Sequence, residues 1–372
     1  MEIFSSLETF PLSSFSCIVI VIFICIKWIL SDSRNRKNIP PSPRKLPIIG
    51  NIHHLGSSPN RNLQILSQKY EYQKLLREFV DMLSAFYIGD YFPWLSWVDQ
   101  VTGTVRRAEK IAKEFDDFLE RIIEEHVSKK KGQDAKSNEG EDFVDILLDL
   151  QKDNTPAFAL QRDTLKALIL EAFSAGTETL QTSLEWAMSE LIRNPRVMKK
   201  LQREVTEIAQ GRSMILEEEL ERMPYLKAVV KESLRLHTPV PLLIQRESVQ
   251  DVKVMGFDIA AGTQVIINAW AIARDSSLWE EPNEFRPKRF LNNSINYQGL
   301  HFEWIPFGAG RRSCPGIQFS VPVMELALAN IVYKFDMVLP NGIKSEDLDM
   351  TEVCGITIHR KSSLIVSVSP RF

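Results

Sequence analysis

The chain has 372 residues, of which 44% are hydrophobic and 25% charged, and its formal net charge is −3. These proportions indicate a globular protein with a large core and exclude a disordered tail protein. Without a basic balance there is no reason to expect nucleic acid as a partner. The four cysteines form neither a disulfide framework nor a paired zinc spacing, so we expect the folded part to face a reducing compartment. They are Cys17, Cys25, Cys314 and Cys354.

The N-terminus carries an uncharged, apolar stretch from Thr9 to Ile26, about the length that a helix needs to cross the hydrocarbon core of a bilayer. A secretory signal peptide is the alternative, but the apolar part is long, no small-residue cleavage site is evident, and positive charges follow the stretch. These charges are Lys27, Arg34, Arg36 and Lys37. By the positive-inside rule, residues 1–30 are predicted to be a single-pass membrane anchor, with the rest of the chain cytosolic.

Residues 31–52 are basic and rich in proline. The run "IPPSPRKLPIIGN", from Ile39 to Asn51, cannot continue a helix and is stiff. We therefore predict a hinge at 31–52 that joins the anchor to a folded domain at 53–372.

The body of the chain is predicted to be mainly helical, with small β-sheets near its end. Helical periodicity from Lys69 to Lys131 is interrupted by an aromatic-rich turn, Ile88 to Trp97. Ser128 to Asp142 is charged and nearly free of apolar side chains, which predicts a solvated loop.

A long helix is predicted from Asp163 to Pro195, and at 1.5 Å per residue it spans roughly 45 Å. Its centre, Ala175 to Thr179, holds Gly176 among polar residues, and the glycine alone costs about 1 kcal/mol in a helix. Taken by itself, this pattern favours a tolerated glycine with exposed polar neighbours.

A second helix, which begins near Pro224, places Glu232 and Arg235 three residues apart on one face. The simple interpretation is a surface ion pair worth tenths of a kcal/mol. The surrounding apolar residues instead predict partial burial, where an unpaired charge would be costly. Arg289, in "FRPKRF", is the candidate third partner.

The stretch "PFGAGRRSCPGI" holds one cysteine, Cys314, directly before a predicted helix. A helix N-terminus favours an anion, so this position suits a thiolate. A single thiolate without a second cysteine or a histidine nearby suits a metal whose other ligands come from a cofactor, as in a haem with an axial cysteine. Arg312, two residues earlier, is placed to pair with a haem propionate.

At this point the chain resembles the cytochrome P450 family, specifically the A-type microsomal monooxygenases of plants. The haem-loop pattern F-x-x-G-x-R-x-C-x-G is matched by Phe307, Gly310, Arg312, Cys314 and Gly316. The E-x-x-R motif corresponds to Glu232 and Arg235, and the arginine of the P-E-R-F-like element to Arg289. The oxygen-activation motif A-G-x-[DE]-T-[TS] corresponds to Ala175, Gly176, Glu178 and Thr179, with Leu180 in place of the final hydroxyl residue.

The resemblance implies a haem-thiolate monooxygenase that inserts one oxygen atom of O2 into a small hydrophobic substrate of the plant specialised-metabolite type. Cys314 would ligate the iron of haem b, and Gly176, Glu178 and Thr179 would form the groove for O2 and the proton relay. Other residues implied to bind the cofactor are Arg312, Arg246, Phe307, Gly308 and Gly316. Those implied to line the substrate cavity are Phe173, Val240, Leu242, Leu243, Ile356 and Thr357.

The resemblance also implies partners and a location. Electrons would come from an NADPH-cytochrome P450 reductase, and the chain would be held by membrane lipid at the endoplasmic reticulum with its catalytic domain in the cytosol.

The family pattern is interrupted after Tyr70, where well over a hundred residues are absent. By comparison with the family, the missing parts are the early sheet, the B–C region and two helices of the central bundle. Trp270 and Arg274 have the W-x-x-x-R spacing of the lost propionate clamp but belong to another landmark. Such a loss uncovers apolar surface at about 25 cal/mol per Å², so a catalytically inactive truncated isoform or gene-model fragment is the alternative hypothesis. A haem-binding or membrane scaffold is a third, which no residue specifically supports.

Overall fold

The structure is a computed structural model that describes residues 74–83, 85, 87–132, 142–152, 160–353 and 355–371, with the side chains of 129–132 excepted. All of them belong to one unit, Ser67–Phe372. The predicted anchor at 1–30 and hinge at 31–52 lie outside the described residues. Within the described ranges, no helix combines the length and the apolar character needed to cross a membrane.

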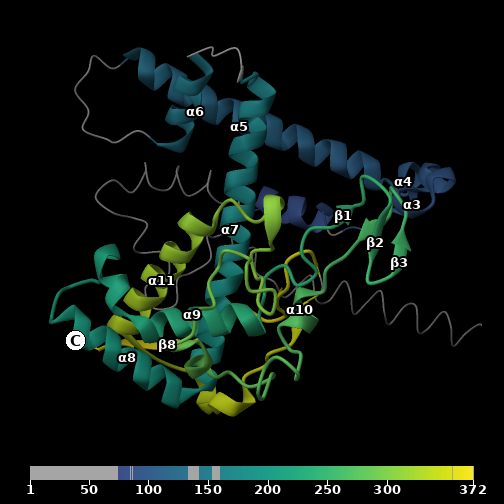
Figure 1. The fold of residues 1–372 in the computed structure, drawn as a ribbon. Coiled ribbons are helices and arrows are strands. Elements are labelled where there is room, and N and C mark those ends of the chain that lie inside the picture. Colours follow the sequence, from purple (N-terminus) through teal and green to yellow (C-terminus); the bar gives the residue numbers. More distant parts are fainter. Residues whose placement is uncertain are drawn as a thin grey trace, which may run out of the picture. The chain divides into compact units, whose positions relative to one another are not determined.

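The described residues are mainly helical with small two-stranded sheets, as the sequence predicts. A helix occupies 74–83. The longer helices that follow are α5 (Thr104–Gly132), α6 (Phe143–Lys152), α7 (Arg162–Arg193), α8 (Pro195–Ala209), α9 (Pro224–Leu236) and α11 (Ile317–Lys334) (Figure 1). Short helices are α3 (Ile88–Tyr91), α4 (Ser96–Val101) and α10 (Ala269–Ile272), with 3-10 turns at Pro93–Leu95, Glu217–Arg222, Pro287–Phe290, Gly310–Arg312, Pro340–Gly342 and Ser345–Asp347.

The strands form antiparallel pairs. β1 (Arg246–Glu247) pairs with β4 (Gln264–Val265), and β2 (Val252–Val254) with β3 (Phe257–Ile259). β5 (Phe335–Val338) pairs with β8 (Ser367–Pro370), and β6 (Glu352–Val353) with β7 (His359–Arg360). Each of these four described sheets has only two strands, so each depends on neighbouring parts of the fold for its stability.

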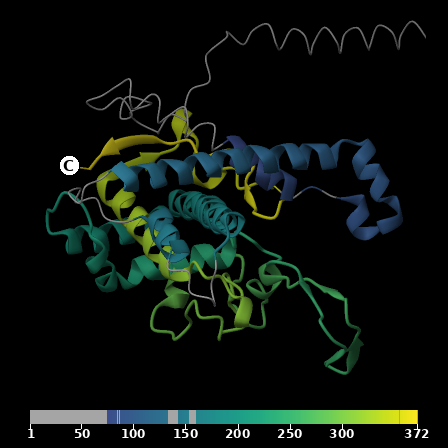
Figure 2. The same ribbon diagram turned by 90° about the horizontal axis from the view of Figure 1, so that it is seen from above.

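Helix α7 links two hydrophobic clusters. Its first turns contribute Leu165 and Ile169 to a cluster with α5 and α6. Its last turns, from Ala187 to Ile192, enter the main core with α8, α9 and α11. The two views show that the long blue helix α5 crosses the teal α7 near the first turns of α7 (Figure 1 and Figure 2). The predicted helix Asp163–Pro195 is thus confirmed to within two residues, with Pro195 opening α8.

Two sequence-based boundaries are corrected. The aromatic-rich turn at 88–97 contains the short helices α3 and α4 with a 3-10 turn between them. Helix α5 continues to Gly132, so the predicted loop from Ser128 starts too early. The Ser128 hydroxyl donates to the carbonyl oxygens of Glu124 and Glu125, one turn earlier in the same helix.

Candidate functional site

Cys314 lies in a tight turn at the start of α11. The Cys314 N–H donates to the Phe307 carbonyl oxygen at 2.9 Å, which closes the turn. Gly308 and Gly310 have φ values of 71° and 76°, in the left-handed region that glycine adopts without strain. The thiol is free and exposed, and Gly316 is the N-cap of the following helix. The turn therefore fixes the cysteine backbone while its sulfur faces outward.

The set of donor groups at this turn fits a haem better than a bare metal ion. Among the described residues, Cys314 belongs to no group of three histidine, cysteine or carboxylate side chains close enough to share an ion. The group that meets this criterion is His126, on α5, with Asp142 and Asp145, just before and within α6. A lone sulfur ligand suits a metal whose remaining ligands belong to a cofactor.

Two predicted propionate-binding arginines meet at this turn. The Arg246 guanidinium, from β1, donates to the carbonyl oxygen of Arg312 at 2.9 Å. Within the described part of the chain, neither side chain forms an ion pair within 4.0 Å. Both positive charges are thus available to an anionic group at the edge of the cysteine turn.

Phe307 is held from behind by aromatic side chains. Its ring meets Tyr297 edge-on with centroids 5.6 Å apart. Tyr297 in turn lies 5.1 Å from Trp304, and Trp304 lies 5.1 Å from Phe290. This cluster connects the cysteine turn to the core, which makes the turn a rigid support.

The middle of α7 is open. None of residues 171–181, all of which the structure describes, is buried. A Cβ added to Gly176 would meet no described atom within 4 Å outside its own helix backbone. The Thr179 hydroxyl donates to the Ala175 carbonyl oxygen at 2.6 Å, so it is held against the turn that contains Gly176.

Glu178 points to a residue that the sequence did not single out. Its Oε1 lies 3.3 Å from Nδ1 of His359, on β7. The same nitrogen lies 3.0 Å from Oγ1 of Thr182, one turn further along α7. Glu178 and Thr182 are polar residues four positions apart on α7, which could have indicated a shared partner. The sequence did not identify that partner, because His359 on β7 is 177 residues away from Thr182.

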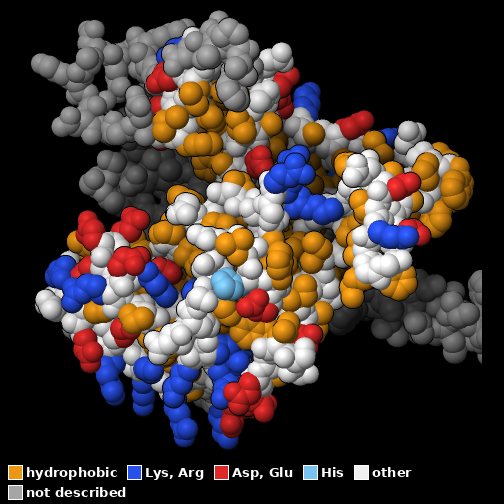
Figure 3. Space-filling view, viewed as in Figure 1, with side chains coloured by type: hydrophobic (Ala, Val, Ile, Leu, Met, Phe, Trp, Pro, Cys, Tyr) orange, Lys and Arg blue, Asp and Glu red, His pale blue; other side chains and the backbone are white. Residues whose placement is uncertain are grey.

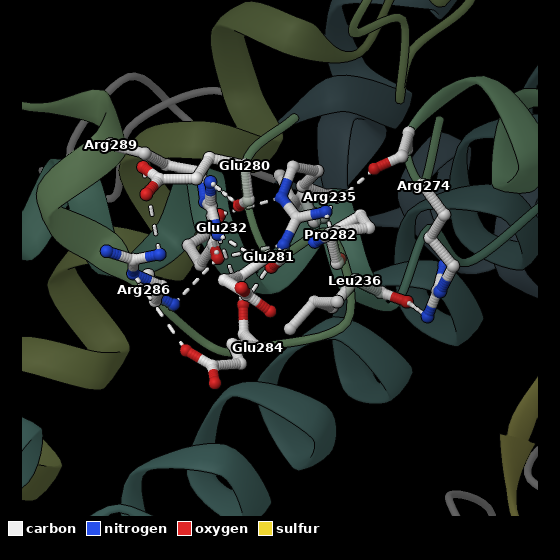
Figure 4. A network of polar contacts seen from close by, with 12 residues as sticks. Glu232, Arg235, Leu236, Arg274, Glu280, Glu281, Pro282, Glu284, Arg286 and Arg289 are labelled. Atoms are coloured by element: carbon white, nitrogen blue, oxygen red, sulfur yellow. Dashed lines mark hydrogen bonds and ion pairs between the residues drawn. The ribbon is translucent and has the colours of Figure 1, made fainter. Parts of the chain in front are cut away.

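Glu232, Arg235 and Arg289 are brought together by α9 and the 3-10 turn at 287–290 (Figure 4). Both Glu232 and Arg235 are 0% exposed. Arg235 donates to Glu232 at 2.8 and 2.9 Å, and Arg289 Nε donates to Glu232 Oε1 at 2.9 Å. Arg235 also donates to the carbonyl oxygens of Ala273 and Pro282, each at 2.7 Å. These bonds satisfy the buried charges and attach α9 to the loops before the cysteine turn.

The predicted cavity residues come from three segments. Val240, Leu242 and Leu243 follow α9, and Ile356 and Thr357 precede β7. The Ile358 N–H donates to the Pro239 carbonyl oxygen at 2.9 Å, which joins these two segments. Thr357 is buried, whereas Leu242, Ile356 and Phe173, on α7, are exposed.

A pocket of about 530 Å³ lies elsewhere, between 74–90, α5 and the first turns of α7. Phe79, Phe115 and Leu170 contribute to its lining, and none of the predicted cavity residues does.

The comparisons with known proteins agree with the motifs. The family model for cytochrome P450 matches residues 65–366. Cytochrome P450 Tp4149 of Tanacetum parthenium is 44% identical to this chain. The alignment extends over 497 residues and includes 99% of this chain and 99% of that protein. Cytochrome P450 71A4 of Solanum melongena is 53% identical over 298 residues, and (+)-menthofuran synthase of Mentha piperita is 47% identical over 301. The chain belongs to the cytochrome P450 monooxygenase family, and these relatives come from plants.

The same alignments locate a difference in length. The alignment with Tp4149 extends over 497 residues, although this chain has 372. Well over a hundred of its positions therefore have no residue of this chain. The match with 71A4 covers 80% of this chain but only 59% of that protein, and the match with menthofuran synthase covers 81% and 60%.

Proposed function

We propose that this chain is a haem-thiolate monooxygenase that inserts one oxygen atom of O2 into a small hydrophobic plant metabolite. The observation that carries the proposal is the turn at 307–316, which presents a single cysteine sulfur at a helix N-terminus beside two arginines without ion-pair partners among the described residues. The cofactor is haem b, with Cys314 as its axial ligand and Arg246 and Arg312 toward its propionates. When bound, the haem supplies the activation of O2.

The remaining residues act around the cofactor. Phe307, Gly308 and Gly316 hold the cysteine turn in shape, while Glu232, Arg235 and Arg289 hold the segment that leads to it. Gly176 leaves space on α7, where no described atom lies within 4 Å of an added Cβ. Glu178 and Thr179 hold and deliver protons beside that space.

The substrate is small and apolar in this proposal. Phe173, Val240, Leu242, Leu243, Ile356 and Thr357 present apolar groups with one hydroxyl, which suits a molecule recognised by shape and little polarity. The names of several relatives are consistent with such substrates: one is a menthofuran synthase, one a norfluorocurarine oxidase from Strychnos and one a 3-beta-hydroxylase from Tanacetum parthenium.

Membrane lipid at the endoplasmic reticulum and an NADPH-cytochrome P450 reductase are the proposed partners. Apolar side chains gather over α3 and α4 (Figure 3), where Trp94 is 72% exposed and Tyr91, Phe92 and Trp97 are also exposed. Exposed aromatic residues of this kind favour the interface between lipid and water. This surface supports membrane contact by the folded domain in addition to the anchor predicted at 1–30.

A catalytically inactive truncated form is the second candidate function. We propose that the fold is a cytochrome P450 fold without its early sheet, B–C region and two bundle helices. The middle of α7 favours this candidate, because none of residues 171–181 is buried, and a long helix without covering neighbours loses the burial that stabilises a fold.

The reduced carbon monoxide difference spectrum separates the two candidates. A Soret band shifted to the red by thiolate ligation supports the monooxygenase, whereas absence of haem uptake by the purified full chain supports the inactive form. Cys314→Ser should abolish the band and the matched variant Cys354→Ser should retain it. A band that survives Cys314→Ser would remove the proposed ligand.

A further inference from the structure

The segment 358–364 follows one side of α7 over about three turns, from Glu178 to Ser189. The Trp186 indole N–H donates to the Ile358 carbonyl oxygen at 3.0 Å, and the Leu364 N–H donates to Glu185 Oε1 at 2.7 Å. Arg360 donates to the Ser189 hydroxyl. The face ends at Glu178 and Thr182, which both meet His359. Glu178, Thr182, Trp186 and Ser189 follow one another at intervals of three or four residues, as expected for one side of a helix, and Glu185 borders this side.

His359 is held firmly enough to act as the fixed partner in these contacts. Its strand β7 pairs with β6, with Val353 opposite His359. The preceding residue, Ile358, is bonded both to Trp186 and to Pro239. The Glu178 side chain, by contrast, extends from the open middle of α7. The histidine therefore determines where the carboxylate lies, because its own backbone is fixed from two sides.

The contact places the Glu178 carboxylate against the His359 imidazole at ion-pair distance, with 3.3 Å between Oε1 and Nδ1. With side-chain exposures of 18% for Glu178 and 33% for His359, the pair is only partly screened by water. Nδ1 of His359 is hydrogen-bonded to Thr182 Oγ1 at 3.0 Å, which holds the ring, and Glu178 Oε1 lies 3.3 Å from the same nitrogen. Holding the long Glu178 side chain in one rotamer costs on the order of 1 kcal/mol, which the contact with His359 must offset.

We infer that His359 is a positioning residue for proton delivery in the oxygenase reaction, which it serves by fixing the carboxylate of Glu178, the residue before Thr179 on α7. This inference rests on the proposed function, since it assumes that Glu178 and Thr179 supply protons when O2 is reduced. His359 itself acts through Glu178 and does not contact substrate.

The first test compares two ways of supplying oxygen to the full chain. With NADPH, reductase and O2, turnover requires two electrons and two protons, whereas cumene hydroperoxide brings an oxygen atom that is already reduced. The probe substrate is 7-ethoxycoumarin. His359→Leu should lower NADPH-driven dealkylation at least about tenfold, because general acid–base steps contribute about 10²–10⁴ to a rate. Peroxide-driven dealkylation should stay within about twofold, since it bypasses that step.

Two further variants complete this test. His359→Asn places an amide N–H near the position of Nδ1 and should restore most of the NADPH-driven rate. Lys361→Gln, on the exposed residue two positions along, is the matched control and should change neither rate. If His359→Leu lowers both rates equally, or if asparagine restores nothing, the positioning role is wrong.

The second test needs no haem and therefore separates this inference from the proposed function. Amide hydrogen exchange of the peptide 174–186 should become faster in His359→Leu and return toward wild type in His359→Asn. Amide exchange in α8 is the internal control and should be unchanged, because the side-chain contacts of His359 are with α7. If the wild-type chain takes up no haem, the proposed function fails, while unchanged exchange at 174–186 in His359→Leu would overturn the positioning inference itself.

Discussion

Replacing Glu325 with glutamine should flatten the dependence of the unfolding free energy on pH. Glu325, on α11, is 5% exposed, and burial raises the pKa of its carboxyl from 4.5 to about 7. The nearby positive charges of Lys227 and Lys231 on α9 oppose this rise without cancelling it. Burial also lowers the pKa of Lys231. The carboxyl is thus protonated in the folded protein at a pH where it is ionised in the unfolded chain.

The sign of the effect follows from proton binding. Between pH values of 4.5 and about 7, the folded state binds more protons at Glu325 than the unfolded state does, so this residue makes the protein less stable as pH rises. Because one pKa unit corresponds to 1.36 kcal/mol, a shift of this size costs about 3 kcal/mol above the raised pKa. Glutamine has the shape of the protonated acid and cannot ionise.

Urea unfolding followed by circular dichroism at pH 5, 6, 7 and 8 measures the difference. Glu325→Gln should be within about 1 kcal/mol of wild type at pH 5 and about 3 kcal/mol more stable at pH 8. Glu207→Gln, on the exposed surface of α8, controls for the loss of one carboxyl group. A difference that is constant from pH 5 to 8, or that shrinks as pH rises, would refute the assignment of a buried carboxyl with a raised pKa.

Three other substitutions test the site. Glu232→Ala should destabilise the protein by about 3–5 kcal/mol in urea unfolding, because it leaves Arg235 buried without its partner, whereas Lys344→Ala in an exposed ion pair should cost less than about 1 kcal/mol. Equal effects would contradict the burial of the pair. Gly176→Ala should raise thermal stability by about 1 kcal/mol, since the added methyl group meets no described atom within 4 Å, while monooxygenation falls; a loss of stability would mean that other parts cover this turn. Trp186→Phe should cost about 1 kcal/mol by removing the hydrogen bond to Ile358 while keeping the stack on His237, with centroids 4.1 Å apart, and an unchanged unfolding midpoint would show that this bond does not hold β7 on α7.

Much of the fold can be predicted from local patterns in the sequence. The 32-residue helix α7 was predicted nearly to its ends, because an acidic residue opens it and Pro195 closes it. The end of α5 was misplaced because the lysine-rich run after Ser128 has no apolar periodicity, although lysine is compatible with helix. Composition identified that run as solvated but did not distinguish a solvated helix from a loop.

The candidate site could be predicted from the sequence only in part. The cysteine turn reads as one local unit, since the glycines, the arginine and the helix start all lie within 307–317 of the chain. Arg289 was named as a partner of Glu232 from its flanking phenylalanines, and the structure places its Nε 2.9 Å from the carboxylate. The partner of Glu178 was missed, because nothing in the sequence near His359 indicates which helix that strand lies against.

The sequence by itself determined the elements and chemistry that depend on neighbours in the chain: the long helix with Gly176 at its centre, the cysteine at a helix N-terminus, and membership of the cytochrome P450 family. Only the tertiary structure decided which distant groups share an environment. It placed His359 against Glu178 and Thr182, buried Glu325 against α9, and left residues 171–181 without a fully buried side chain. Hydrogen bonds and burial depend on proximity in space, and the spacing of residues along a chain does not fix that proximity once loops intervene.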